Sequence, residues 1–172
     1  EKVIDSFLAL SEIVGPDAMA WRYDPIFLDE TYTVDYHLKA FEHIAARLCD
    51  ATKTCVISFI DLYQKVRKNF PEVRSVGKDD RIFLGKEMIE IAAMTVRPCG
   101  EGNELAPYDA DCNGCMTQQV YETALHTSLI FPKKQPLRKE CACFLGNDIG
   151  AYNTCPHLCR YCYANYDEQT VR

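Results

Sequence analysis

Apolar residues recur along the chain in two alternating patterns. In the first, they are spaced three or four residues apart, which is typical of a helix with one buried face. In the second, apolar and β-branched residues follow one another almost without interruption, which is typical of a strand buried on both faces. The two patterns predict helices over residues 3–14, 34–48, 61–70, 81–91 and 117–127, and strands over residues 19–23, 54–60 and 94–97.

Several residues mark where these elements begin and end. Asp24-Pro25 is expected to end the first strand, Thr33 to cap the second helix, and Pro71 to end the third helix. Between the helix over 81–91 and the strand over 94–97 there are almost no turn residues. Either this join is unusually tight or a few residues are absent from the chain. From Phe131 onward the pattern predicts mostly irregular structure around cysteines.

The alternation of helices and strands predicts a parallel α/β fold. Three parallel strands alone would leave long unpaired edges, which proteins avoid or cover. The simplest closure is a partial (β/α) barrel of the TIM type, and we therefore expect N-terminal strands to be missing. An upstream N-terminal part or another copy would complete the sheet. The predicted division is residues 1–130 as the C-terminal part of a barrel and residues 131–172 as a Cys-rich cluster-binding segment.

Polar or reactive side chains follow each predicted strand. In barrel folds the chemistry lies at the carboxyl ends of the strands, so these side chains are candidates for a site. The alternative is that the aspartates cap turns or helices and that the arginine is held in an ion pair. No catalytic residue can be chosen among them. The candidates are Arg22 and Asp24, then Ser58 and Asp61, and finally Cys99 and Glu101.

Three cysteines near the end of the chain have the spacing CxxxCxxC: Cys155, Cys159 and Cys162. Thiolates select zinc, copper(I) and iron–sulfur clusters. Three protein ligands leave a fourth position open, whereas a structural zinc site is normally closed by four. The motif therefore favours a cluster that another molecule completes. The alternative is a zinc site that uses these cysteines with one more thiol or His157.

The remaining cysteines suggest a second site. A CxxC and a CxC motif together offer four thiols, enough for a closed zinc site or an auxiliary iron–sulfur cluster. The alternative is that these thiols are scattered and pack as small hydrophobic groups. Cys49 and Cys55 fall within the helix and strand patterns and are expected in the core. The candidates for the second site are Cys99, Cys112, Cys115, Cys141 and Cys143.

Composition limits the class of protein. The 172 residues, 48% of them hydrophobic, suffice for one globular domain. Ten cysteines are fewer than a secreted disulfide scaffold of this length would carry, and neither a membrane span nor a signal peptide is recognisable. We therefore expect a cytoplasmic protein with reduced thiols. A net charge of −6 argues against nucleic-acid binding by the whole surface. The basic run over residues 133–139 is either a solvated loop or an anion contact beside a cofactor.

The CxxxCxxC motif, with an aromatic residue just before its last cysteine, resembles the signature of radical S-adenosylmethionine (SAM) enzymes. Tyr161 fills the aromatic position. The resemblance implies that Cys155, Cys159 and Cys162 hold a 4Fe-4S cluster, and that the amino and carboxylate groups of SAM chelate the open iron.

The whole chain also resembles an uncharacterised bacterial family, domain of unknown function 1848. The resemblance lies in the segments WRYDPI, TVDYHL, CVISFIDLYQK, CGEG and CACFLGNDIGAYNTCPHLCRYCYAN. Members of that family look like radical SAM relatives whose cysteine motif lies near the C-terminus. The family also has an N-terminal part with early strands that this chain lacks, and it supplies no substrate.

Two functions follow as expectations. The first is an enzyme that cleaves SAM reductively to a 5′-deoxyadenosyl radical, with an unknown substrate and an electron donor as partners. The second is a noncatalytic metal-binding module, a zinc or iron–sulfur staple or an electron-transfer site, without SAM. In the enzyme, Arg22 or Arg160 is expected near the SAM carboxylate. The other expected SAM contacts are Tyr161 and Tyr163 near adenine, and Asp24, Ser58 or Glu101 toward the ribose.

Overall fold

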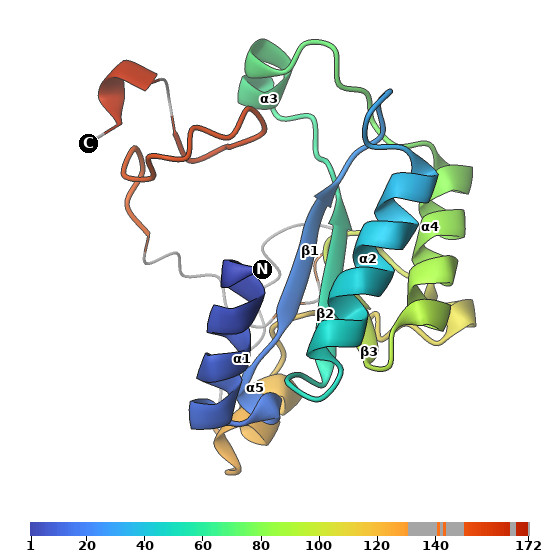
Figure 1. The fold of residues 1–172 in the computed structure, drawn as a ribbon, viewed down its shortest axis with the longest axis vertical. Coiled ribbons are helices and arrows are strands. Elements are labelled where there is room, and N and C mark those ends of the chain that lie inside the picture. The colour runs from blue at the N-terminus through green and yellow to red at the C-terminus, as the bar shows by residue number, and fades with distance from the viewer. Residues whose placement is uncertain (131–140, 142, 144–149, 166–167, 172) are drawn as a thin grey trace.

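The computed structural model describes residues 1–130, 141, 143, 150–165 and 168–171 (Figure 1). Within these residues, three parallel strands form an open sheet in the order β1-β2-β3. The strands are β1 (Trp21–Ile26), β2 (Thr54–Phe59) and β3 (Thr95–Pro98). The basic run over residues 133–139 lies outside the described residues. The predicted parallel α/β fold is thus confirmed.

Helices alternate with the strands along the chain. Two of them begin just after a threonine that caps the first turn. The side chain of Thr33 accepts a hydrogen bond from the N–H of Tyr36, and that of Thr117 accepts one from the N–H of Val120. The helices are α1 (Lys2–Val14), α2 (Val34–Leu48), α3 (Gln64–Asn69), α4 (Lys78–Ile91) and α5 (Gln118–Leu125), with short 3-10 turns at Pro16–Ala18, Ala106–Tyr108 and Glu168–Thr170.

Three predicted boundaries were wrong. β1 does not stop at Asp24-Pro25 but continues to Ile26, with a shift of register between Tyr23 and Ile26. A proline is tolerated there because β1 is an edge strand and its missing N–H interrupts only one ladder. The third helix begins at Gln64 rather than 61, and the fourth begins three residues early, at Lys78. The join between α4 and β3 is indeed short, residues 92–94.

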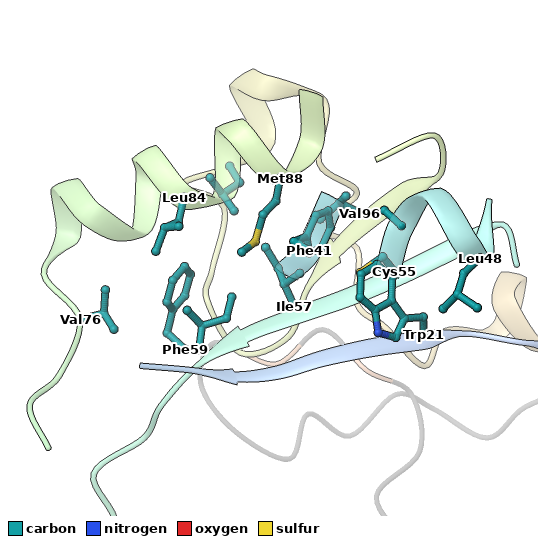
Figure 2. Close-up of a cluster of buried hydrophobic side chains, with 13 residues drawn as sticks. Trp21, Phe41, Leu48, Cys55, Ile57, Phe59, Val76, Leu84, Met88 and Val96 are labelled. Atoms are coloured by element: carbon teal, nitrogen blue, oxygen red, sulfur yellow. The ribbon is translucent and has the colours of Figure 1, made fainter. Parts of the chain in front are cut away.

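The apolar core lies between the sheet and the two helices α2 and α4 (Figure 1). Figure 2 shows Phe41 of α2 and Leu84 and Met88 of α4 facing Ile57 at the centre of the sheet. These four side chains are fully buried. The ring of Trp21 stacks on Phe41 with centroids 4.9 Å apart. The helical stripes read from the sequence therefore form this core.

The two cysteines predicted for the core, Cys55 and Cys49, differ in how deeply they are buried. Cys55 is buried in this core, and burial raises its pKa to about 12, so it packs as a neutral, small hydrophobic group. Cys49 lies at the C-terminal end of α2, where it is only partly buried. Its expected place in the core was wrong because the helix ends one residue before it. In the described part of the chain, no helix has the length and apolar character needed to cross a membrane.

Candidate functional site

The three strands present different side chains to their two faces. Because successive side chains in a strand point to opposite faces, residues that alternate with the core positions lie on the other side of the sheet. Trp21, Cys55 and Val96 belong to the helix-covered core. Their neighbours Arg22, Val56 and Arg97 are aligned with one another across the sheet by the strand register. We call the side that carries these three residues the second face.

At the carboxyl ends of the strands, the second face opens into a cavity of about 470 Å³. This volume lies within the roughly 300–1,000 Å³ of ordinary small-molecule sites. The cavity has two walls that are distant in the sequence. One comes from the strands and the residues just after them, and the other from the C-terminal cysteine segment, which contributes Cys159, Tyr161, Cys162 and Tyr163. The strand wall consists of Arg22, Asp24, Pro25, Ser58, Phe59, Ile60, Asp61, Tyr63 and Cys99.

The polar part of the strand wall is a connected network. The guanidinium of Arg22 donates to Asp24 Oδ2 over 2.8 Å, and Ser58 Oγ donates to Asp24 Oδ1. Burial lowers the pKa of Arg22, but its hydrogen bonds to Asp24 and Cys99 outweigh burial, and the net pKa is raised. Arg22 is therefore a permanent cation held in an ion pair, as the alternative interpretation of the strand-end residues proposed.

The C-terminal segment is attached to α3 and the residues that follow it. Figure 1 shows residues 150–165 running beside α3. Arg160 donates to the carbonyl of Asn69 over 3.0 Å, pairs with Glu72 over 2.6 Å and lies 4.3 Å from the centroid of the Phe70 ring. Lys65 of α3 donates to the carbonyl of Tyr163 over 2.6 Å. Arg160 is thus occupied in docking the segment and does not line the cavity.

Within the segment, a short turn brings two of the motif cysteines together. The N–H of Cys162 donates to the carbonyl of Cys159 over 2.9 Å, and both residues line the cavity. Cys155 is exposed and lies outside the cavity lining. The buried side chain of Asn165 donates to the carbonyl of Cys155 over 2.7 Å and so ties the two ends of the motif together. Sequence analysis missed this role of Asn165.

Tyr161 lies between the cavity and the aromatic ring of Phe27. It lines the cavity, and its ring centroid is 6.4 Å from that of Phe27. Partial burial and the neighbouring Cys159 raise the pKa of its phenol, which keeps the ring neutral. The ring of Tyr163 lies 6.3 Å from that of Tyr63 on the other side of the segment. Both tyrosines expected beside adenine therefore reach the cavity.

A second group of cysteines lies on the second face, beside Val56. Cys115, Cys141 and Cys143 are buried there, and Cys99 packs against them. The sulfur of Cys115 is 3.5 Å from that of Cys99 and 3.3 Å from that of Cys143. We call these four residues the thiol cluster. Its contacts with Cys99, together with burial, raise the pKa of Cys115, so that thiol is protonated in this arrangement.

The structure separates two other candidates from these groups. Cys112 is only partly buried and is not part of the thiol cluster, although it lies three residues from Cys115. Glu101 does not line the cavity; its carboxylate accepts the N–H of Phe59 over 2.9 Å, and burial raises its pKa. Across the described ranges, no three His, Cys, Asp or Glu side chains are already arranged to hold a metal ion. None of the ten cysteines forms a disulfide.

Arg97 is a further residue that sequence analysis overlooked. Its side chain is nearly buried on the second face, pairs with Asp111 over 2.8 Å and donates to the carbonyl of Gly114 over 3.0 Å. It thereby fixes the loop that delivers Cys115 to the sheet. The signal was present in the sequence, since Arg97 lies two residues before Cys99 and so on the same face of β3.

The chain matches a known protein family. Residues 1–164 match the model of the family described as "Domain of unknown function (DUF1848)". The chain belongs to the DUF1848 family. That description names no activity and no cofactor, so membership establishes the family and leaves the resemblance to radical SAM enzymes untested. Among curated proteins and among solved structures, the searches found no match.

Proposed function

We propose that this DUF1848 protein is an iron–sulfur protein of the radical SAM type, in which Cys155, Cys159 and Cys162 hold a 4Fe-4S cluster at the mouth of the cavity and SAM occupies the cavity. The observation that carries this proposal is that the strand ends and the cysteine segment line the same cavity. The strand ends and the cysteine segment are more than fifty residues apart in sequence, yet they enclose a single space of about 470 Å³.

The three motif cysteines are chemically suited to bind an iron–sulfur cluster. Three thiols that are not in disulfides lie on one short segment, and thiolates are the usual ligands of iron–sulfur clusters. Two of them already face the cavity, while Cys155 must turn inward to join them. The bound cluster would supply the electron that cleaves SAM to a 5′-deoxyadenosyl radical.

The chain's own residues would bind the SAM molecule and exclude water. Tyr161 and Tyr163 form the aromatic wall suited to adenine, and Phe59 and Ile60 also line the cavity. Arg22 lines the cavity and could bind a ligand carboxylate, but it is already paired with Asp24. A carboxylate ligand would therefore have to share the guanidinium with Asp24, whose other oxygen is held by Ser58.

The same proposal includes the finer architecture. The open sheet is parallel, and its cavity lies at the carboxyl ends of the strands, which is where (β/α) barrels bind their ligands. We propose that the sheet is the C-terminal part of such a barrel, with the second face turned toward the barrel interior. Polar and reactive residues on that face, rather than a second apolar layer, support this assignment.

The test is anaerobic purification and reconstitution with iron and sulfide, followed by metal analysis and by visible and paramagnetic resonance spectra with and without SAM. We expect a coloured protein whose resonance signal changes when SAM is added. Replacing any one of the three motif cysteines with Ala should remove most of the iron, whereas Cys49→Ala, at the end of α2, should leave it in place.

A colourless protein that takes up only zinc under these conditions would contradict the proposal and favour the noncatalytic module. An iron–sulfur spectrum that does not respond to SAM would leave an electron-transfer or structural cluster. Iron content unchanged in all three single variants would show that the motif is not the cluster site.

A further inference from the structure

The thiol cluster is built from three separate parts of the chain. Cys99 follows β3, Cys115 lies on the loop before α5, and Cys141 and Cys143 come from the region beyond α5. Cys115, Cys141 and Cys143 are each at least nine-tenths buried, and Cys99 packs against them. Buried cysteines can pack singly as hydrophobic groups, but here four converge on one side chain, Val56, with two sulfur–sulfur contacts.

We propose that Cys99, Cys115, Cys141 and Cys143 form a tetrathiolate site for a single zinc ion, separate from the CxxxCxxC motif. Sulfur-only tetrahedral sites select zinc or iron–sulfur centres. The distances argue against a four-iron cluster. A four-iron cluster places its cysteine sulfurs on four different irons and keeps them out of mutual contact, whereas the sulfurs here lie 3.3 and 3.5 Å apart.

For the two sulfur pairs that are in contact, the rearrangement that zinc requires is small. A tetrahedron with Zn–S bonds of about 2.3 Å has sulfur–sulfur edges of about 3.8 Å, so the observed contacts need to open by only a few tenths of an ångström. In the arrangement described, the sulfurs of Cys99, Cys115 and Cys143 touch in a row with Cys115 in the middle and do not yet surround a common point, in line with the lack of a preformed metal group among the described residues. Binding would replace the thiol protons, which pass to solvent, by one metal ion.

The surroundings favour such an anionic centre. A zinc ion with four thiolates carries a net charge of −2, which a buried site must offset. The guanidinium of Arg22, which also pairs with Asp24, lies 3.9 Å from the sulfur of Cys115 and offsets part of this charge. Arg97 fixes the carbonyl of Gly114, immediately before Cys115. Because four protein ligands close the coordination sphere, the zinc would be structural. It would fasten residues 141 and 143, and with them the start of the C-terminal segment, to the second face of the sheet.

The site can be tested without the proposed cluster. In the full chain carrying Cys155→Ala, Cys159→Ala and Cys162→Ala together, we expect one equivalent of tightly bound zinc. Cobalt(II) in its place should show the absorption of a tetrahedral ion with four thiolate ligands. Adding Cys143→Ser to this variant should weaken zinc binding by more than the roughly 10- to 100-fold that loss of an outer-shell contact costs. Cys112→Ser is the matched control and should change nothing.

Three results would overturn the site. The first is a triple variant that binds no stoichiometric zinc, and the second is a Cys112→Ser variant that loses zinc as completely as Cys143→Ser does. The third is a purified protein two hydrogens lighter with two fewer titratable thiols, in which peptide mapping finds Cys115 in a disulfide with Cys99 or Cys143. If Cys143→Ser does not fold, the cobalt spectrum of the triple variant still counts the thiolates. Because the motif cysteines are absent throughout, failure of the radical SAM proposal would not affect these outcomes.

Discussion

The two faces of the sheet are made by alternate residues of the same three strands, yet they differ in almost every physical respect. On the helix-covered face, Ile57 and Val96 lie against α2 and α4 in an apolar core. On the second face, Val56 lies against thiols, and Arg22 is tied to Asp24. Burial is similar on both sides at the centre of the sheet, since Val56 and Ile57 are both almost completely buried. Burial alone therefore does not distinguish a core from a site; the chemistry of what is buried does.

The sharpest test of this comparison uses Val56 and Ile57, which are adjacent residues of β2. Ile57→Ala should lower the free energy of unfolding by about 2–5 kcal/mol, because it opens a cavity between the sheet and two helices. Val56→Ala removes fewer methyl groups and should cost roughly 1–3 kcal/mol. The two variants should also differ in a second property: only Val56→Ala should weaken zinc binding, because Val56 is the apolar support of the thiol cluster.

Urea unfolding of both variants, with zinc affinity measured on the folded proteins, would check this prediction. If Ile57→Ala lowered zinc affinity as much as Val56→Ala did, the two faces would not be independent. If neither changed it, the thiols would not depend on the support of Val56.

A smaller effect is expected from Arg22→Ala. Loss of one partner of a buried charged contact costs about 2–5 kcal/mol. The side chain of Arg22 is 45% exposed and already paired with Asp24, so we expect the lower end, a weakening of SAM binding of about 30-fold, with the cluster retained. Calorimetry on the reconstituted protein measures this. Arg47→Ala is the control, since Arg47 is also in an ion pair, with Glu1 at 3.0 Å, but lies on α2 away from the cavity.

SAM binding unchanged in Arg22→Ala would show that the strand-end assignment is wrong. Because Arg22 also contacts the sulfur of Cys115, zinc content should be measured in the same sample. A variant that loses zinc and SAM binding together would show that Arg22 couples the cavity to the thiol cluster.

The helix-covered face was largely predictable from the sequence, and the second face only in part. Periodicity located the five α-helices and three strands of the described residues because the stripes of α2 and α4 and the apolar run of β2 record burial directly. The strand-end rule placed Arg22, Asp24 and Ser58 at the cavity, but it also included Glu101, which turns its carboxylate to the N–H of Phe59. No local pattern could show that Cys115 meets Cys99 and Cys143 or that Cys112 does not. Those contacts depend on how the loop held by Arg97 crosses the sheet.

The smallest effect is expected at the one buried histidine of the helix-covered side. His37 on α2 lies between the hydroxyl of Tyr23, 2.9 Å from its Nδ1, and the carbonyl of Phe27, 2.8 Å from its Nε2. Burial lowers its pKa from the usual 6.5, and the contact with Phe27 and the charge of Asp29 only partly offset this. Below pH 6.5 the unfolded chain therefore binds more protons at this position than the folded protein does. Stability from this group is complete above that pH and is lost as the pH falls through the window below it.

His37→Gln, which keeps a hydrogen-bonding side chain, should flatten this dependence. We expect the difference in unfolding free energy between the parent protein and this variant to shrink as the pH is lowered from neutral toward about 5, because only the parent must then bury a group that protonates when unfolded. Urea unfolding at a series of pH values measures it. His43→Gln, at an exposed position on the same helix, is the matched control. A His37→Gln curve parallel to that of the parent would show that the buried histidine does not contribute to the pH dependence of the helix-covered face.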